Sequence, residues 1–367
     1  MGTSSKVRHL EDVEIVLSDT ERKHLVLTGK NGSGKTSLLN AMKYGILGDS
    51  MHDDIWPHPY YATGNLETEL ITITFSKSFT NGNFYDFTFV HIPARRSELI
   101  APKTVEKSMS FRDANIAENV YTNFIQYIID LDFQIYGAQK RNDTEKEANL
   151  NQWFDNFRAA LCIIYDCQEL KFHLDAKKKN YEIIIPGREP FFLNEMSDGY
   201  ASFMYIVMEL LMRFETDNAT VDYNQPAIVL IDEIEAHLHI ALQKKILPFL
   251  TTMFPNVQFI VSTHSPFIIN SLVDAVVYDL ETNQRLENPS LYSYEAVVEG
   301  FFDVGQYSND MKTTFARYKE LYTKARNADE AIEFQQLITK LEQVPPASRE
   351  LYVVFRNMED KRKNDKN

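Results

Sequence analysis

The chain has 367 residues, a formal net charge of −14 and 44% hydrophobic residues, which excludes a fibrous or disordered protein. No run approaches the roughly 18 apolar residues of a membrane span, and the first residues contain no apolar signal core, so we expect a cytoplasmic protein without a membrane partner. The acidic balance excludes a DNA binder that relies wholly on electrostatics, although it leaves room for a local basic groove.

The N-terminal part of the chain has the pattern of strands around a glycine-rich loop. Alternating apolar residues over 13–17 and the apolar run 25–27 predict two strands, the second of them buried and parallel. Apolar residues at helical spacing predict a helix over 37–46. The runs 70–75 and 84–90 are rich in β-forming residues and flank an Asn-Gly-Asn turn, so we expect them to pair as an antiparallel hairpin.

The rest of the chain alternates helical and strand patterns. Helical periodicity over 105–168 predicts long helices joined by a polar loop at 139–151. The late aromatic residues Phe315, Tyr318 and Tyr322 share one helix face, so we expect them to pack in a core, with a protein-docking surface as the alternative. The other expected elements are a hairpin over 170–185, a helix over 202–214, buried strands over 227–231 and 257–261, and helices from about residue 293 onward.

The glycine-rich loop over residues 29–36 matches the motif G-x-x-x-x-G-K-[ST] in full. Glycines let successive backbone N–H groups turn inward around phosphates, and the following helix points its positive N-terminus at them. Lys35 is placed to neutralise phosphate charge and Thr36 to ligate Mg²⁺. The sequence therefore predicts a site for ATP and Mg²⁺, with the nucleotide bound by Gly29, Asn31, Gly32, Ser33, Gly34, Lys35, Thr36 and Ser37.

Two carboxylates and a histidine follow the predicted buried strands. Asp232 and Glu233 end the first strand, at the sheet edge where ligands bind in such folds. We expect Asp232 to hold Mg²⁺, and Glu233 to polarise the attacking water. His264 follows the second strand and could contact the γ-phosphate, so Glu233, His264 and Lys35 are the predicted catalytic residues. A solvated acidic turn and a structural histidine are the simpler interpretations.

Three further motifs make the chain resemble the ABC-type ATPases, in particular the soluble branch that includes RecF, SMC heads and OLD-type (overcoming-lysogenization-defect) ATPases. Met196-Ser197-Asp198-Gly199-Tyr200 is similar to the signature loop of the family. Residues 232–239 are similar to the D-E-x-E-x-H-L-H run of the OLD-like branch, and 262–266 to its switch-histidine loop. The order and spacing agree along residues 10–275.

The resemblance implies an α/β fold. We expect an ABC-type P-loop ATPase head, with a mixed sheet and an antiparallel β subdomain, joined to a helical insertion and a C-terminal helical extension. The expected divisions are an ATPase lobe with the P-loop and the antiparallel subdomain over 1–92, a helical insertion with a hairpin over 93–192, a second ATPase lobe over 193–290, and the extension over 291–367.

The resemblance also implies a dimer in which two heads enclose two ATP molecules. Ser197, Asp198 and Gly199 of one subunit would then face the γ-phosphate held by the P-loop of the other. Standalone OLD-like ATPases of bacterial anti-phage systems, such as the Septu type, work with a separate nuclease. We therefore expect an ATPase that regulates an effector partner. The alternatives are a RecF-like DNA repair ATPase, which binds nucleic acid itself, and a non-hydrolysing ATP-gated scaffold.

Several assignments stay open at this point. Arg95 or Arg96 could contact the nucleotide or form a surface pair. His237 and His239 do not share a helix face, which favours structural or dimer-facing roles over zinc binding. The lysines at 177–179 could line a nucleic-acid groove, although a short charge run is more often a solvated turn. The glutamine of the family's Q-loop has three candidates, Gln126, Gln134 and Gln139.

Overall fold

The chain forms two compact units, Met1–Phe302 and Asp303–Asn367, in a computed structural model. Across the described ranges, every helix is too short or too polar to cross a lipid bilayer. The structure describes residues 2–7, 9–18, 21–47, 62–66, 69–73, 88–94, 120–214, 221–294, 296–298, 309–323, 327–342 and 354–359.

The first unit contains a six-stranded sheet in the order β13-β12-β3-β11-β10-β6. All neighbouring strands are parallel except β13, which pairs antiparallel with β12 at one edge. Every residue of β3, β10 and β12 is buried, as expected for parallel strands that are covered on both faces. The bounds are β3 (His24–Thr28), β6 (Thr88–Ile92), β10 (Ala227–Ile231), β11 (Val257–Ser262), β12 (Ala275–Asp279) and β13 (Gln284–Glu287).

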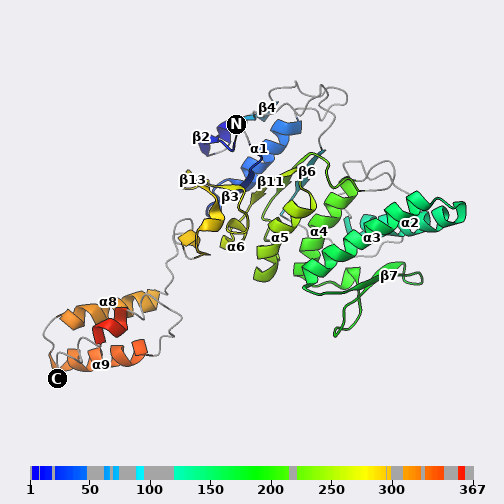
Figure 1. Cartoon of the computed structure of the whole chain (residues 1–367). Coiled ribbons are helices and arrows are strands. Elements are labelled where there is room, and N and C mark those ends of the chain that lie inside the picture. The colour runs from blue at the N-terminus through cyan, green and yellow to red at the C-terminus, as the bar shows by residue number, and fades with distance from the viewer. Residues whose placement is uncertain are drawn as a thin grey trace. The chain divides into compact units, whose positions relative to one another are not determined.

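Two hydrophobic cores cover the two faces of this sheet. Leu25 and Leu27 of β3 pack with α1 (Lys35–Leu47), whereas Val26 between them belongs to the other core, with α4 (Asp198–Arg213) and α5 (Ile240–Met253). Successive residues of a strand point to opposite faces, so an uninterrupted apolar run serves both cores. Figure 1 shows α4 and α5 side by side along the sheet. The predicted parallel strands and the α/β fold class are confirmed.

A second, antiparallel sheet corrects one prediction. Its order is β2-β1-β5-β4, so β5 pairs with β1 and β4. The predicted hairpin between 70–75 and 84–90 is wrong, because β6 lies in the large sheet, parallel to β10. β-forming residues predict a strand but do not specify its partner, and in β6 the buried Val90 and Ile92 pack in the large core. The bounds are β1 (Gly2–Val7), β2 (Leu10–Ile15), β4 (Ala62–Leu66) and β5 (Glu69–Ile73).

Two long helices, α2 (Val120–Arg141) and α3 (Thr144–Tyr165), run side by side away from α4 (Figure 1). The predicted polar loop at 139–151 is wrong, because only two residues separate these helices. The side chain of Asp143 accepts a hydrogen bond from Lys146 N (3.2 Å) and caps α3, whose exposed first turns explain the polar run.

The predicted hairpin over 170–185 is confirmed as part of a three-stranded antiparallel sheet in the order β7-β8-β9. The side chain of Asp175 accepts hydrogen bonds from the backbone N–H groups of Lys177 and Lys178, at 2.9 and 3.1 Å, which stabilises the exposed turn. The strands are β7 (Lys171–Asp175), β8 (Asn180–Ile184) and β9 (Phe191–Phe192), followed by the 3₁₀ helix η3 (Leu193–Glu195).

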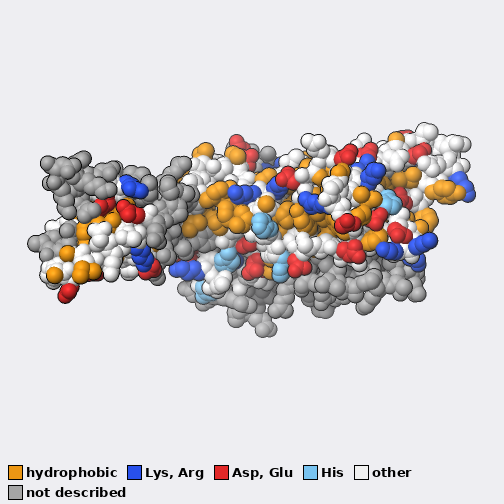
Figure 2. Space-filling view, turned by 90° about the horizontal axis from the view of Figure 1, so that it is seen from below, with side chains coloured by type: hydrophobic (Ala, Val, Ile, Leu, Met, Phe, Trp, Pro, Cys, Tyr) orange, Lys and Arg blue, Asp and Glu red, His pale blue; other side chains and the backbone are white. Residues whose placement is uncertain are grey.

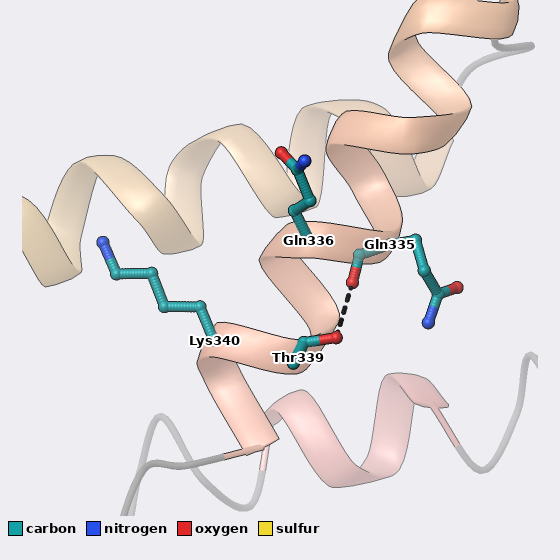
Figure 3. Close-up of a pocket in the computed structure, with 4 residues that line it drawn as sticks. All are labelled: Gln335, Gln336, Thr339 and Lys340. Atoms are coloured by element: carbon teal, nitrogen blue, oxygen red, sulfur yellow. Dashed lines mark hydrogen bonds between the residues drawn. The ribbon is translucent and has the colours of Figure 1, made fainter.

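The second unit is helical and has its own core. It contains α8 (Asn309–Thr323), α9 (Ala328–Glu342) and a short helix over 354–359. Phe315 and Tyr318 are buried and Tyr322 packs against them, so the predicted core packing of this aromatic face is confirmed. The buried Tyr318 hydroxyl donates to Glu359 Oε1 at 2.8 Å. A shallow depression on α9 is lined by Gln335, Gln336, Thr339 and Lys340 (Figure 3), none of which was predicted to bind nucleotide.

Candidate nucleotide site

The P-loop leaves the end of β3 and leads directly into α1. Gly29, Gly32 and Gly34 have φ values of 130°, 84° and 97°, which L side chains rarely adopt. A Cβ atom on Gly29 would lie 2.7 Å from Ser33 Oγ, and one on Gly34 would lie 2.9 Å from Leu10 Cδ1. The loop therefore requires glycine at both positions, for conformation and for space. A loop of this kind before a helix N-terminus suits an anion.

Lys35 folds back into this loop and is only 6% exposed. Its Nζ donates to the carbonyl oxygens of Gly29 (2.8 Å) and Lys30 (3.1 Å). Burial lowers the pKa of the Lys35 ammonium, and the carboxylates of Glu233 and Glu235 act in the opposite direction. The structure therefore brings this cation together with the acidic residues that follow β10.

Asp232 connects three elements at the carboxyl edge of the sheet. Thr36 Oγ1, at the start of α1, donates to Asp232 Oδ2 at 2.9 Å across 196 residues of sequence. Ser262 Oγ, at the end of β11, donates to Asp232 Oδ1 at 2.5 Å. The same Ser262 hydroxyl accepts a hydrogen bond from Glu233 N at 2.7 Å. Sequence reasoning did not assign this role to Ser262, which it named only as the first residue of the switch-histidine loop over 262–266.

The segment that follows β10, here called the carboxylate loop (residues 232–239), turns sharply. Glu233 has a φ of 44° and His237 a φ of 65°, both in the left-handed region that non-glycine residues seldom adopt. Ile234 N donates to Ser262 O at 3.1 Å, so the loop stays attached to β11 after the strand has ended. Left-handed residues held by surrounding structure are concentrated at functional sites.

The switch loop (residues 263–265) lies against the carboxylate loop. His264 N donates to Glu235 Oε1 at 2.5 Å, while the second oxygen of Glu235 is buried and has no hydrogen-bond partner within the described ranges. Burial lowers the pKa of His264, Lys35 acts in the same direction, and the nearby carboxylates oppose it. Burial thus favours the neutral form of this imidazole. Glu235 is a second residue whose contribution sequence reasoning did not specify.

The signature-like segment, residues 197–199, stands at the start of α4. Ser197 is the N-cap of this helix, makes no capping hydrogen bond with its side chain, and is exposed. A Cβ on Gly199 would lie 3.1 Å from the carbonyl oxygen of His237, and Ser202 Oγ donates to Ala236 O at 2.7 Å. In its own chain this segment therefore packs against the carboxylate loop.

The open assignments have different outcomes. Arg95 and Arg96 lie outside the described residues. The three glutamine candidates all lie on α2, where Gln126 donates to Asp130 Oδ1 at 2.7 Å and Gln139 to Glu147 Oε1 at 2.8 Å. His237 and His239 are exposed, and within the described ranges no three His, Cys, Asp or Glu side chains are grouped to hold a metal ion.

The chain is similar to several known proteins. A family model described as "AAA domain, putative AbiEii toxin, Type IV TA system" matches residues 110–270. Septu protein PtuA of Bacillus mycoides (strain KBAB4) is 27% identical over 359 residues, which cover 89% of this chain and 48% of PtuA. The predicted resemblance to anti-phage ATPases is confirmed. This chain spans about half the length of that relative.

Two further proteins are similar to this chain, one over a smaller share of its length and the other at lower sequence identity. The Retron Ec83 probable ATPase of Escherichia coli is 30% identical over 145 residues, which cover 37% of this chain and 26% of that protein. Among solved structures, the SMC head bound to the C-winged helix domain of ScpA covers 77% of this chain and 95% of its own, at 14% identity and a TM-score of 0.42.

Proposed function

We propose that this chain binds Mg-ATP and hydrolyses it in the manner of an ABC-type ATPase. The observation that carries the proposal is the 2.9 Å hydrogen bond between Thr36 Oγ1 of the P-loop helix and Asp232 Oδ2 at the end of β10. Hydroxyl and carboxylate oxygens are the ligands that Mg²⁺ prefers, so this pair fits the metal that accompanies ATP. Lys35 and the backbone N–H groups of the P-loop would bind the phosphates.

The remaining residues would act on the water and on the γ-phosphate. Thr36 and Asp232 would hold Mg²⁺, which when bound screens the phosphate charge. Glu233 would accept a proton from the attacking water. His264, which burial keeps neutral, would donate a hydrogen bond to the γ-phosphate. Ser262 would hold the Asp232 carboxylate and the Glu233 backbone in place through its two hydrogen bonds.

ATP binding and single-turnover hydrolysis of the full chain test this proposal. Glu233→Gln should retain ATP affinity and lose turnover by more than about 100-fold, since a general base contributes roughly that much. Lys35→Ala should lose ATP binding. Glu145→Gln makes the same chemical change on the exposed first turn of α3 and should match wild type. Equal turnover in the Glu233→Gln and Glu145→Gln proteins would refute the assignment of Glu233.

We further infer that two copies associate around Mg-ATP, with Ser197, Asp198 and Gly199 facing the partner's P-loop. The support is the exposed N-terminus of the 16-residue helix α4, where Ser197 does not use its hydroxyl to cap its own helix. In sedimentation, Glu233→Gln should form a dimer when Mg-ATP is added, and a further Ser197→Arg change should prevent it. Identical profiles with and without ATP, at a monomer mass, would contradict the arrangement.

The cellular role that we propose is control of a separate effector, a nuclease, in anti-phage defence. The similarity to a Septu protein and to a retron ATPase supports it. On the face drawn in Figure 2, described Lys and Arg side chains are interspersed with Asp and Glu, which does not favour a single basic groove for nucleic acid there.

A pull-down of Glu233→Gln from its host with Mg-ATP, together with a turnover assay of the wild-type chain, separates the three functions. A stoichiometric nuclease partner, identified by mass spectrometry, supports effector control. DNA without a protein partner favours the RecF-like alternative, and ATP binding without turnover in the wild-type chain favours the scaffold.

A further inference from the structure

The side chain of Gln243, in the first turn of α5, connects two functional loops. Its Nε2 donates to the carbonyl oxygen of Leu238 at 2.7 Å, and its Oε1 accepts from Ser265 Oγ at 2.6 Å. A backbone carbonyl can only accept, so the amide nitrogen must face Leu238 and the oxygen must face Ser265. Leu238 and Ser265 are both buried, so water does not readily replace either hydrogen bond.

Each end of this bridge lies on a loop that carries a predicted catalytic residue. Leu238 belongs to the carboxylate loop, which carries Glu233. Ser265 directly follows His264, and its hydroxyl also accepts from Phe267 N (3.1 Å), at the start of α6 (Pro266–Ile269). Gln243 thereby joins the loop of Glu233 to the loop of His264.

A second connection joins the same two loops. Glu235 Oε1 accepts from His264 N, so the switch loop is attached to the carboxylate loop at His264 and again, through Gln243, at Ser265. The backbone of the switch loop is also held by β3, because Thr263 N donates to Leu27 O at 2.9 Å, so the two attachments add to an existing backbone link. The carboxylate loop is also bonded to α4, the helix that begins with the signature-like segment, because Ala236 O accepts a hydrogen bond from Ser202 Oγ.

The helix itself does not need this side chain. The N-terminus of α5 is capped by His239, whose Nδ1 accepts from Ala241 N, and the buried Leu242, Ile246 and Leu250 anchor the helix in the core. Loss of the Gln243 side chain would therefore leave the cap and the core contacts of α5 in place.

We propose that Gln243 is a positioning residue for ATP hydrolysis, which holds His264 in a fixed relation to Glu233. This inference rests on the proposed ATPase function. The side chain does not touch the P-loop contacts of Lys35 and Thr36, so it acts on turnover rather than on nucleotide binding.

The test measures kcat and the Kd for a fluorescent ATP analogue on the full chain. Gln243→Leu removes both hydrogen bonds and should lower kcat about 10- to 100-fold, because small misplacements of reacting groups cost about that much. The Kd should change less than about threefold. Gln243→Glu keeps the size and the acceptor for Ser265 but loses the donor to Leu238, so its kcat should fall as well.

Gln258→Leu is the matched control. Gln258 Nε2 donates to the carbonyl oxygen of Lys23 at 2.8 Å, which is the same kind of hydrogen bond at a distance from the two loops. This variant should keep wild-type kcat.

The outcomes separate the two proposals. Wild-type kcat in both Gln243 variants overturns the positioning role, and so does a loss of ATP binding in proportion to the loss of turnover, which indicates general damage. Absence of turnover in the wild-type chain instead refutes hydrolysis itself, and with it the reaction that Gln243 would serve.

Discussion

Replacing Ser262 with alanine would remove the hydroxyl that joins the two carboxylate residues of the site. Asp232 Oδ1 would lose its 2.5 Å hydrogen bond, and Glu233 N would lose its 2.7 Å acceptor, in a place where the serine is fully buried. A hydrogen bond to a charged group is worth about 1.5 to 3 kcal/mol, and one between neutral groups about 1 kcal/mol. Since these contributions are not additive, we expect a loss of about 3 kcal/mol in the unfolding free energy of the first unit.

Tryptophan fluorescence during urea unfolding measures this loss. Trp153 is buried in the core of the first unit, and the sequence of the second unit, Asp303–Asn367, contains no tryptophan, so the signal does not come from the second unit. With a slope near 3 kcal/mol/M, the midpoint should fall by about 1 M urea. Ser271→Ala is the control, because its hydroxyl donates only to a backbone carbonyl at 2.7 Å and is worth about 1 kcal/mol. Equal midpoint shifts in the two variants would refute the reasoning.

Three other predictions concern residues of the first unit. Gly34→Ala should weaken ATP binding more than about 10-fold, since its new Cβ lies 2.9 Å from a leucine carbon, whereas Gly187→Ala also has positive φ but meets open space and should bind normally. Burial lowers the pKa of His24 from 6.5 to about 4, so between these two pH values the unfolded state binds more protons than the folded state. The free energy of unfolding should therefore fall by about 3 kcal/mol as the pH drops from 6.5 to about 4. His24→Asn should flatten that pH dependence of the urea midpoint, and an unchanged slope would count against burial as its cause. Asp143→Ala should cost about 1 kcal/mol as a lost N-cap, against about 0.5 kcal/mol or less for Asp155→Ala, which breaks an exposed ion pair with Arg158.

Sequence reasoning worked best where a local pattern determines the structure. The buried run 25–27 predicted a parallel strand because its apolar residues must be covered on both faces, and the structure brings Thr36 and Asp232 together at the sheet edge. It failed where a distant partner decides the outcome. The strand at β6 pairs with β10, more than a hundred residues later, and the composition of 84–90 carries no information about that pairing.

The same distinction applies within the candidate site. The P-loop and the carboxylate pair have spacing that a motif can describe, whereas the contributions of Ser262 and Gln243 depend on which atoms face each other after folding. A serine at a strand end and a glutamine in a helix are common in proteins, so their residue types alone do not identify them.

The central position of β3 has a consequence for synthesis on the ribosome. This strand lies between β11 and β12, whose residues are made more than two hundred positions later. Until then, the apolar residues of β3 have no neighbouring strands to pair with, and the P-loop that follows β3 lacks the contacts with the sheet that hold its conformation. Such long-range pairing is slow and leaves apolar surface open to wrong contacts in the meantime. If the chain binds nucleotide as proposed, a nascent chain would therefore acquire that ability only after the strand that ends at Asp279 has emerged.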